Sequence, residues 1–240
     1  MKENVLIFTA TYNEKKNIQI FLDNFIKLSL AADLLIIDDN SPDNTAIIIK
    51  KYQKKYNNIK LIIRKKKEGL NTAHQMAFEI AKKKKYKYLI TLDSDLTHDV
   101  KLLPIFIKKI KFYSFVIGSR YIPKGKTDIT GWRFLISYFG NRFIKFFFNM
   151  KINEFTSSYR AFNLAKLKNI DFYKIKSSGY SFFMEVVYQI NNMNYSMHEF
   201  PIHAKQRFAG ESKIPKIEII RTLFNLLRLK INKFFKLKIK

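Results

Sequence analysis

Short runs of apolar residues alternate with amphipathic segments along the first half of the chain. Five runs have the length and composition of buried strands, at residues 5–8, 34–37, 59–63, 88–92 and 115–117. The segments between them show the spacing of helices, over residues 15–30, 43–56, 70–83 and 100–111. This alternation predicts an α/β fold built on a largely parallel sheet.

Polar residues follow the ends of four of these predicted strands. Acidic residues stand at three of the ends, and Arg120 follows the fifth strand. Ligands of such sheets bind beyond the carboxyl ends of the strands, so we expect these side chains to lie along one edge. Asp93 and Asp95, separated by one residue, could bind a hard divalent cation that bridges nucleotide phosphates, although an isolated pair of this kind is more often a solvated turn.

Asp39, after the second strand, also has two interpretations. A carboxylate there can accept hydrogen bonds from a ribose or a base edge. The alternative is a helix start, with Ser41 and Pro42 forming the turn before Asp43. Both can hold at once, with Asp39 on a nucleotide and the following residues shaping the loop.

Two apolar stripes with helical spacing occupy the second half of the chain. The first comprises Trp132, Leu135, Ile136, Phe139, Phe143, Phe146, Phe147 and Met150, and core packing is the more common role of such a stripe. The second comprises Ile220, Leu223, Phe224, Leu227, Ile231, Phe234 and Phe235, and lysines and arginines surround it. A basic amphipathic helix suits an anionic membrane surface. We therefore expect a catalytic domain at residues 1–213 and a basic membrane-surface tail at residues 214–240.

The charge balance narrows the choice of partners. Lys and Arg number 45 against 19 Asp and Glu, a formal charge of +26, which favours contact with nucleic acid or an anionic lipid surface. A nucleic-acid-binding protein would group its cations on one recognition element and would not need acidic residues at several strand ends, so no nucleic acid partner is expected.

No apolar stretch approaches the roughly 20 residues that span a bilayer. With no cysteine and no secretory leader, we expect a cytoplasmic protein, peripheral on the cytoplasmic face of a membrane.

Taken in order, the motifs resemble those of the polyprenyl-phosphate (dolichol-phosphate) mannosyltransferases, over nearly the whole chain. They are Thr11-Tyr-Asn-Glu14, Asp38-Asp-Asn-Ser-Pro-Asp43, Gly69-Leu70 with Ala73, Asp93-Ser-Asp-Leu-Thr-His98, Gly118-Ser-Arg-Tyr121, Thr156-Ser-Ser-Tyr-Arg160, Gly179-Tyr180 with Phe182 and Glu185, and Arg207-Phe-Ala-Gly-Glu-Ser-Lys213. The sequence departs from the usual pattern at Ala10, Asn71, Glu154, Ser157 or Ser158, and Gln206. None of these departures removes a carboxylate or an arginine of the expected site.

The resemblance implies an inverting glycosyltransferase with the GT-A fold. It implies a catalytic set of Asp93, Asp95, Arg120 and Arg207, and a metal site at Asp95 and Thr97 for Mg²⁺ or Mn²⁺. Donor binding is implied for Ala10, Tyr12, Glu14, Ile37, Asp39, Asp93, Ser94, Asp95, Arg207 and Lys213. Binding of the acceptor phosphate is implied for Arg120, Arg133 and Ser137.

The implied reaction transfers mannose from GDP-mannose to a polyprenyl phosphate. With this acceptor the first apolar stripe gains a second interpretation, as a platform for the prenyl chain with Arg133, Arg142 and Lys145 near lipid phosphates. A phosphate monoester has a second pKa of about 6 and is largely dianionic near neutrality, so its attack needs no general base. The nearest alternative is the same fold with another donor, such as UDP-glucose.

Overall fold

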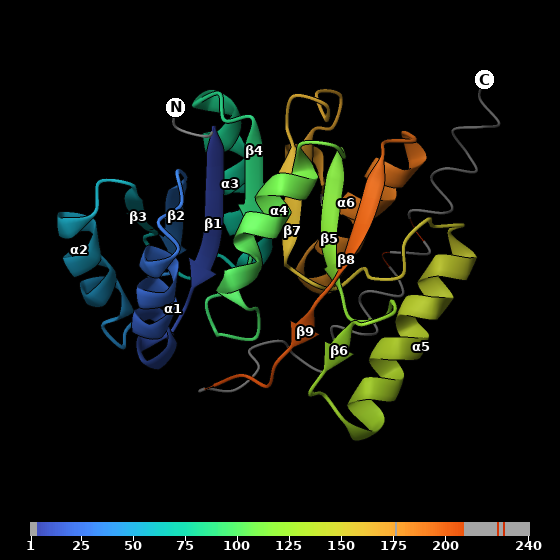
Figure 1. The fold of residues 1–240 in the computed structure, drawn as a ribbon, viewed down its shortest axis with the longest axis horizontal. Coiled ribbons are helices and arrows are strands. Elements are labelled where there is room, and N and C mark those ends of the chain that lie inside the picture. The colour runs from blue at the N-terminus through green and yellow to red at the C-terminus, as the bar shows by residue number, and fades with distance from the viewer. Residues whose placement is uncertain (1–3, 176, 209–224, 226–227, 229–240) are drawn as a thin grey trace.

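A mixed seven-stranded sheet lies at the centre of the protein, with the strand order β3-β2-β1-β4-β7-β5-β8 (Figure 1). The computed structural model describes residues 4–175, 177–208, 225 and 228. The strands are β1 (Val5–Thr11), β2 (Asp33–Asp38), β3 (Ile59–Ile63), β4 (Tyr88–Thr91), β5 (Phe115–Ser119), β6 (Lys126–Thr127), β7 (Arg160–Asn163), β8 (Met197–Pro201) and β9 (His203–Ala204). The helices are α1 (Lys15–Lys27), α2 (Thr45–Lys55), α3 (Leu70–Lys83), α4 (Leu103–Ile110), α5 (Gly131–Phe147) and α6 (Gly179–Asn192), with short 3₁₀ helices η1 (Val100–Leu102) and η2 (Phe172–Lys174).

The predicted alternation of strands and helices in the first half of the chain is confirmed. β1 to β5 contain the five apolar runs almost entirely, and α3 has the predicted bounds. The segment predicted as one helix at 100–111 divides into η1 and α4. The side chain of Asp99 caps η1 by accepting a hydrogen bond from the backbone N–H of Lys101, and a proline stands in the first turn of α4, where its missing N–H costs nothing.

The sheet is not parallel throughout, because β7 runs antiparallel between β4 and β5. Arg160 pairs with Thr91 of β4 on one side and with Ile117 of β5 on the other. One reversed strand between two others leaves β4 and β5 parallel to each other. The loop after β5 therefore still emerges at the same edge as the loops after β1, β2 and β4.

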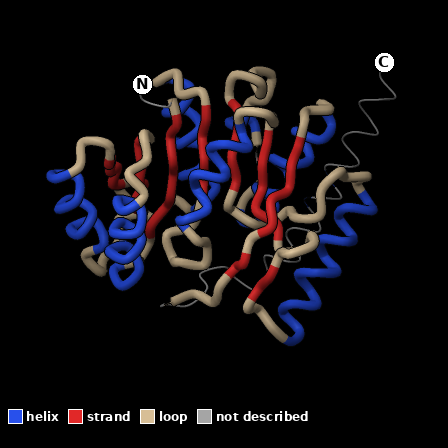
Figure 2. The backbone as a smooth tube through the Cα atoms, viewed as in Figure 1, coloured by secondary structure: helices blue, strands red, loops and turns tan. Residues whose placement is uncertain are grey.

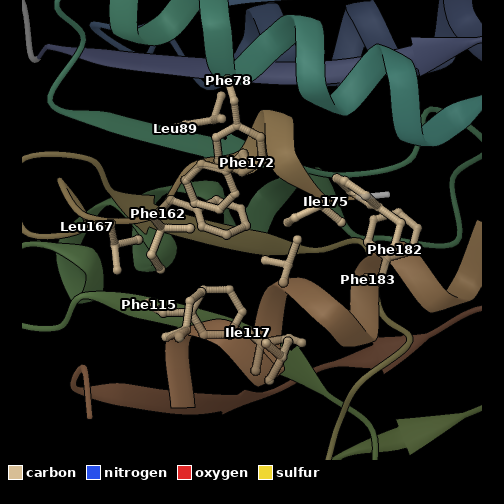
Figure 3. Packing of buried hydrophobic residues seen from close by; sticks show 14 of the residues in the cluster. Phe78, Leu89, Phe115, Ile117, Phe162, Leu167, Phe172, Ile175, Phe182 and Phe183 are labelled. Carbon is tan, nitrogen blue, oxygen red and sulfur yellow. The ribbon is translucent and has the colours of Figure 1, made fainter. Parts of the chain in front are cut away.

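Helices cover both faces of the sheet (Figure 2). On one face, α1, α2 and α4 pack against the sheet through residues such as Phe21, Ile49 and Phe106. On the other face, α3 and α6 enclose an aromatic cluster in which the rings of Phe78 and Phe172 stack with centroids 3.7 Å apart (Figure 3). Burial of these large apolar side chains holds the strands in register, and with them the loops at the strand ends.

Helix α5 lies outside these two layers (Figure 1). Most of its apolar stripe is exposed. Of the two interpretations of the stripe, core packing is therefore wrong for most of its members. Exposed side chains on α5 are Trp132, Leu135, Ile136, Phe139, Phe143 and Phe146. Phe146 is 89% exposed, whereas Asn141 and Ile144 on the opposite side of the helix are buried. The helix thus attaches to the body through a narrow face and presents a broad apolar one.

The predicted donor ligand Lys213 and the predicted tail at residues 214–240, except for residues 225 and 228, lie outside the described residues. Among the residues that are described, no helix has both the length and the apolar character needed to cross a bilayer.

Candidate active site

The loop after β4 carries the two carboxylates that the sequence singled out. Asp95 is buried, and its Oδ1 accepts hydrogen bonds from the backbone N–H of Thr97 at 3.1 Å and from the Thr97 hydroxyl at 2.6 Å. Between them, Leu96 has a φ of +66°, a left-handed conformation that is costly for a non-glycine residue. The tight turn therefore folds the loop so that Asp95 and Thr97 lie together, as the predicted metal pair requires.

Arg207 brings a positive charge to this loop from the far end of the described chain. Its Nη2 lies 2.7 Å from Asp95 Oδ2, and its Nη1 lies 3.5 Å from Glu14 Oε1. Glu14 follows β1 and is also buried, and it accepts a hydrogen bond from the Asn17 amide at 2.6 Å. The structure thus joins three predicted residues, from the first strand end, the fourth strand end and the late basic segment, in one charged cluster.

Asp93 stands at the edge of the same cluster and keeps 38% of its side chain exposed. Desolvation raises the pKa of Asp93, with a further contribution from the nearby carboxylate of Asp95, while His98 and Arg207 oppose the rise. The ring Nδ1 of His98 accepts a hydrogen bond from the backbone N–H of Asp93 at 3.2 Å. The negative charges of Asp93 and Asp95 repel each other, so the pair favours a cation between or beside the two carboxylates.

The donor set fits a hard divalent cation. Carboxylate and hydroxyl oxygens from Asp93, Asp95 and Thr97 are the ligand types that Mg²⁺ and Mn²⁺ prefer. The described residues contain no group of three or more His, Cys, Asp or Glu side chains arranged as a metal cage. An ion here would therefore complete its coordination with phosphate oxygens and water, which is how Mg²⁺ commonly binds beside nucleotides.

The loop after β2 has its two aspartates in different environments. Asp38 is fully buried and joins two strand ends, because its carboxylate accepts hydrogen bonds from the Thr11 hydroxyl at 2.7 Å and from the Ser41 hydroxyl at 2.6 Å. Asp39 forms an ion pair with the buried Arg64 and accepts a hydrogen bond from the backbone N–H of Gly69 at 3.1 Å. Asp39 is therefore held by the start of α3, and only part of its hydrogen-bonding capacity remains for a nucleotide.

The other predicted donor residues lie around these loops. The Ser94 hydroxyl donates to the carbonyl of Ala10 at 3.3 Å and so links the ends of β4 and β1. The ammonium of Lys67 lies 4.2 Å from the ring centroid of Tyr12 in the loop after β1, a cation–π contact. The side chain of Ile37 is fully buried in the core beneath β2, so this residue acts on the site through packing.

The predicted acceptor residues lie on the other side of the site, after β5 and on α5. Arg120 forms a two-pronged ion pair with the fully buried Glu154, with both N···O distances at 2.8 Å. The hydroxyl of Ser137 accepts a hydrogen bond from the Tyr121 hydroxyl at 2.6 Å. Arg133 is exposed at the start of α5, and its guanidinium carbon lies 5.8 Å from the ring centroid of Trp132.

The model of the family described as glycosyl transferase family 2 matches residues 6–171, which is more than half of the chain. The chain belongs to glycosyl transferase family 2. The matched region contains every carboxylate of the predicted site and Arg120, whereas Arg207 lies beyond its end.

Two curated relatives of this family 2 glycosyltransferase match over most of its length. An undecaprenyl-phosphate mannosyltransferase from Micrococcus luteus is 29% identical over 88% of this chain and 87% of that protein. A polyprenol monophosphomannose synthase from Mycolicibacterium smegmatis is 27% identical over 93% of this chain and 86% of that protein. The predicted resemblance to polyprenyl-phosphate mannosyltransferases is confirmed.

Solved structures confirm the predicted GT-A fold. A glucosyl-3-phosphoglycerate synthase from Mycobacterium tuberculosis, in complex with UDP, superimposes with a TM-score of 0.66 at 13% identity, covering 93% of this chain and 79% of that one. A mannosyltransferase from Pyrobaculum calidifontis, in complex with GDP-Man and Mn²⁺, gives a TM-score of 0.56 at 16% identity, covering 97% of this chain and 65% of that one.

Two buried arginines of this glycosyltransferase support the site and were not predicted from the sequence as site residues. Arg64 fixes Asp39, as described above. Arg160 of β7 is fully buried and donates hydrogen bonds to the carbonyls of Phe155, Ser157 and Phe183 at 2.7–2.8 Å. Burial lowers the pKa of Arg160 to about 9, and Glu154 and Asp93 partly offset that effect.

Each of these arginines, and also His98, offered a weak signal in the sequence. A charged residue that directly borders an apolar run, such as Arg64 or Arg160, is a candidate for a buried ion pair or cap. His98 follows Asp93 within one short loop, which brings the two close in any compact turn. The structure places His98 beside Asp93.

Proposed function

We propose that this family 2 glycosyltransferase transfers mannose from GDP-mannose to the phosphate of a polyprenyl phosphate, releasing GDP. The observation that carries the proposal is the cluster of Asp95, Glu14 and Arg207 at the carboxyl edge of the sheet, the edge at which Arg120 also follows β5. Both curated relatives described above carry names of mannosyl transfer to a polyprenyl phosphate or polyprenol. Their matches span the donor side and the acceptor side alike.

On the donor side, the chain offers both signs of charge to a sugar nucleotide. The two terminal nitrogens of Arg207 contact two different carboxylates, those of Glu14 and Asp95. The nitrogen that contacts Asp95 can therefore turn to a phosphate oxygen of the donor while the other keeps its contact with Glu14. Asp93, Asp95 and Thr97 would hold a divalent cation, which would neutralise charge on the departing nucleoside diphosphate. Tyr12 and Lys67 pair beside the strand-end loops, where a nucleotide base could stack or accept a hydrogen bond.

On the acceptor side, Arg120 is oriented by Glu154 and lies near the start of α5. The ion pair with Glu154 holds the Arg120 guanidinium in one orientation, so less side-chain entropy is lost when Arg120 binds an anion. Arg133 and Ser137 occupy the first two turns of α5, so a phosphate between them and Arg120 would meet two cations and a hydroxyl. Because the phosphate is already dianionic, the task of these groups is to offset repulsion between two anionic substrates, and no general base is needed.

Direct attack of the phosphate oxygen on the anomeric carbon inverts the configuration of that carbon. The bond from the anomeric carbon to the acceptor oxygen forms as the bond to the GDP oxygen breaks, and the electron pair leaves with GDP. An α-linked donor therefore gives a β-linked lipid product.

The exposed apolar face of α5 suits an acceptor that resides in a bilayer. Six large apolar side chains project from this helix, and an exposed patch of that kind marks an interaction surface. The formal charge of +26 would add attraction to anionic lipid. A peripheral position on a membrane follows, and the cytoplasmic location stays a prediction.

The decisive experiment offers radiolabelled donors one at a time to the purified protein with vesicles that contain undecaprenyl phosphate or dolichyl phosphate. We expect label from GDP-mannose to enter the lipid in the presence of Mg²⁺ or Mn²⁺, and no label to enter vesicles that contain the unphosphorylated polyprenol. Transfer from UDP-glucose with none from GDP-mannose would overturn the donor assignment. Transfer from no donor to either lipid would overturn the proposed function.

A further inference from the structure

A short ribbon links the two sides of the candidate active site. β6 and β9 pair in parallel, with Lys126 opposite His203 and Thr127 opposite Ala204. This ribbon lies beyond the carboxyl ends of β5 and β8, between the sheet and α5 (Figure 1). On the acceptor side, three residues lie between Thr127 of β6 and the start of α5 at Gly131. On the donor side, β9 ends at Ala204, three residues before Arg207.

The segment that precedes Arg207 is fixed on two sides by backbone hydrogen bonds. On the acceptor side, the N–H of Asp128 donates to the carbonyl of Ala204 at 2.9 Å. On the donor side, the N–H of Lys205 donates to the carbonyl of Thr97 at 3.0 Å, which attaches the segment to the loop of Asp93 and Asp95. The backbone leading to Arg207 thus bridges the metal loop and the approach to α5.

The side chain of Asp128 fastens the last link of this segment. Its Oδ2 accepts a hydrogen bond from the backbone N–H of Gln206 at 2.9 Å, one residue before Arg207. Its Oδ1 lies 2.5 Å from Nε2 of His203. The carboxylate therefore holds the segment at both ends, at His203 and at Gln206, and sets the direction in which the chain enters Arg207.

We propose that Asp128 is a positioning residue for Arg207, and that its carboxylate keeps the guanidinium aimed at the donor diphosphate. The inference rests on the proposed function. Its physical basis is that a guanidinium must be held within a fraction of an ångström of the developing charge to stabilise it fully, and a backbone anchored at the preceding residue provides that restraint. Asp128 itself is 40% exposed and lies outside the core, so its removal should leave the fold intact.

The test compares Asp128→Ala and Asp128→Asn with the unchanged protein, in steady-state transfer and in GDP binding with Mn²⁺ by calorimetry. We expect Asp128→Ala to lower kcat/KM for the donor about 3- to 10-fold, the loss typical of one or two hydrogen bonds, with an unchanged KM for the lipid acceptor. Asp128→Asn retains an oxygen for the Gln206 N–H and should recover part of that loss.

Asp171→Ala is the matched control. Asp171 also accepts a backbone hydrogen bond, from Tyr173, and pairs with a cation, Lys174, on the surface, but neither contact leads to the site. This variant should transfer at the unchanged rate. If Asp171→Ala lowered kcat/KM as much as Asp128→Ala, the effect would be general and the inference wrong.

A double-variant cycle separates positioning of Arg207 from any other role. In an Arg207→Ala background, Asp128→Ala should cause little further loss, because the group that it positions is absent. Full additivity of the two losses, or unchanged kinetics in Asp128→Ala alone, would overturn the inference.

GDP binding without mannose transfer in the unchanged protein would refute the proposed function alone, and the Asp128 variants could still be judged by GDP affinity. Absence of GDP binding in the unchanged protein would overturn both.

Discussion

The guanidinium of Arg207 lies 2.7 Å from the carboxylate of Asp95, although Asp95 follows β4 and Arg207 follows β9. A buried carboxylate at this edge of the sheet is thus balanced by a cation that can also bind phosphate. We propose that donor binding exchanges this partner for a cation-bound diphosphate.

Asp95→Ala should abolish transfer and leave the fold intact. Asp95 supplies the carboxylate that both Thr97 and Arg207 contact, and its loss would remove the proposed metal ligand and release Arg207. We expect a fall in kcat of at least about 100-fold, the scale typical of a lost electrostatic contact in a transition state. Transfer assays and circular dichroism check the two parts, and full activity in this variant would refute the metal assignment.

Removal of divalent ions should stop transfer reversibly. The fit of Asp93, Asp95 and Thr97 to a hard cation predicts that EDTA abolishes activity and that excess Mg²⁺ or Mn²⁺ restores it. Thermal unfolding gives an independent readout, because a ligand that binds only the folded state raises Tm. GDP together with Mn²⁺ should raise Tm more than either alone, and a Tm indifferent to the metal would contradict the site.

Glu154 should make the stability of the protein sensitive to acid. Desolvation of this buried carboxyl raises its pKa, but the charge and hydrogen bonds of Arg120 and the hydrogen bonds from Thr156 outweigh it, so the pKa is held below its ordinary value of 4.5. A group with a lowered pKa in the folded state stabilises the protein above its unfolded-state pKa, and that stability is lost as the pH falls through the folded-state value.

The measurement for Glu154 is urea unfolding between pH 3 and pH 7. Glu154→Gln should lower the free energy of unfolding near pH 7 by about 3–5 kcal/mol, because it leaves the Arg120 guanidinium without its charge partner, and the penalty should shrink toward pH 3. A penalty independent of pH would show that the carboxyl does not titrate as the ion pair requires.

Trp132 should report the approach of α5 to a membrane. It is the sole tryptophan of the sequence, and its side chain is 60% exposed on the apolar face of α5. Anionic vesicles should shift its fluorescence to shorter wavelength, and Phe146→Glu should weaken that shift, since charge on the apolar face opposes insertion. If the protein sediments with the vesicles but its fluorescence spectrum does not change, the membrane contact lies elsewhere on the protein. Deletion of the tail at residues 214–240 would then test that segment first.

Local patterns in the sequence determined the first half of the fold and the chemistry of its loops. The apolar runs and the polar loops after them alternate at strand and helix lengths, so β1 to β5 and α1 to α4 could be predicted within a few residues. Parallel strands share one carboxyl edge, so the proximity of Glu14 and Asp95 could also be expected from the sequence.

Tertiary packing alone decided how the charges at that edge are paired. β7 is four residues long, begins with an arginine and has no alternation that marks it as a strand, so its antiparallel place between β4 and β5 could not be predicted. The ion pairs of Asp39 with Arg64 and of Arg120 with Glu154 each join different loops. Which arginine a carboxylate pairs with depends on which one folding brings within about 3 Å of it. The apolar stripe of α5 has the spacing of a core helix, and it is exposed because the two faces of the sheet are already covered by other helices. Spacing along a chain fixes which side chains share a face, whereas burial depends on what that face meets.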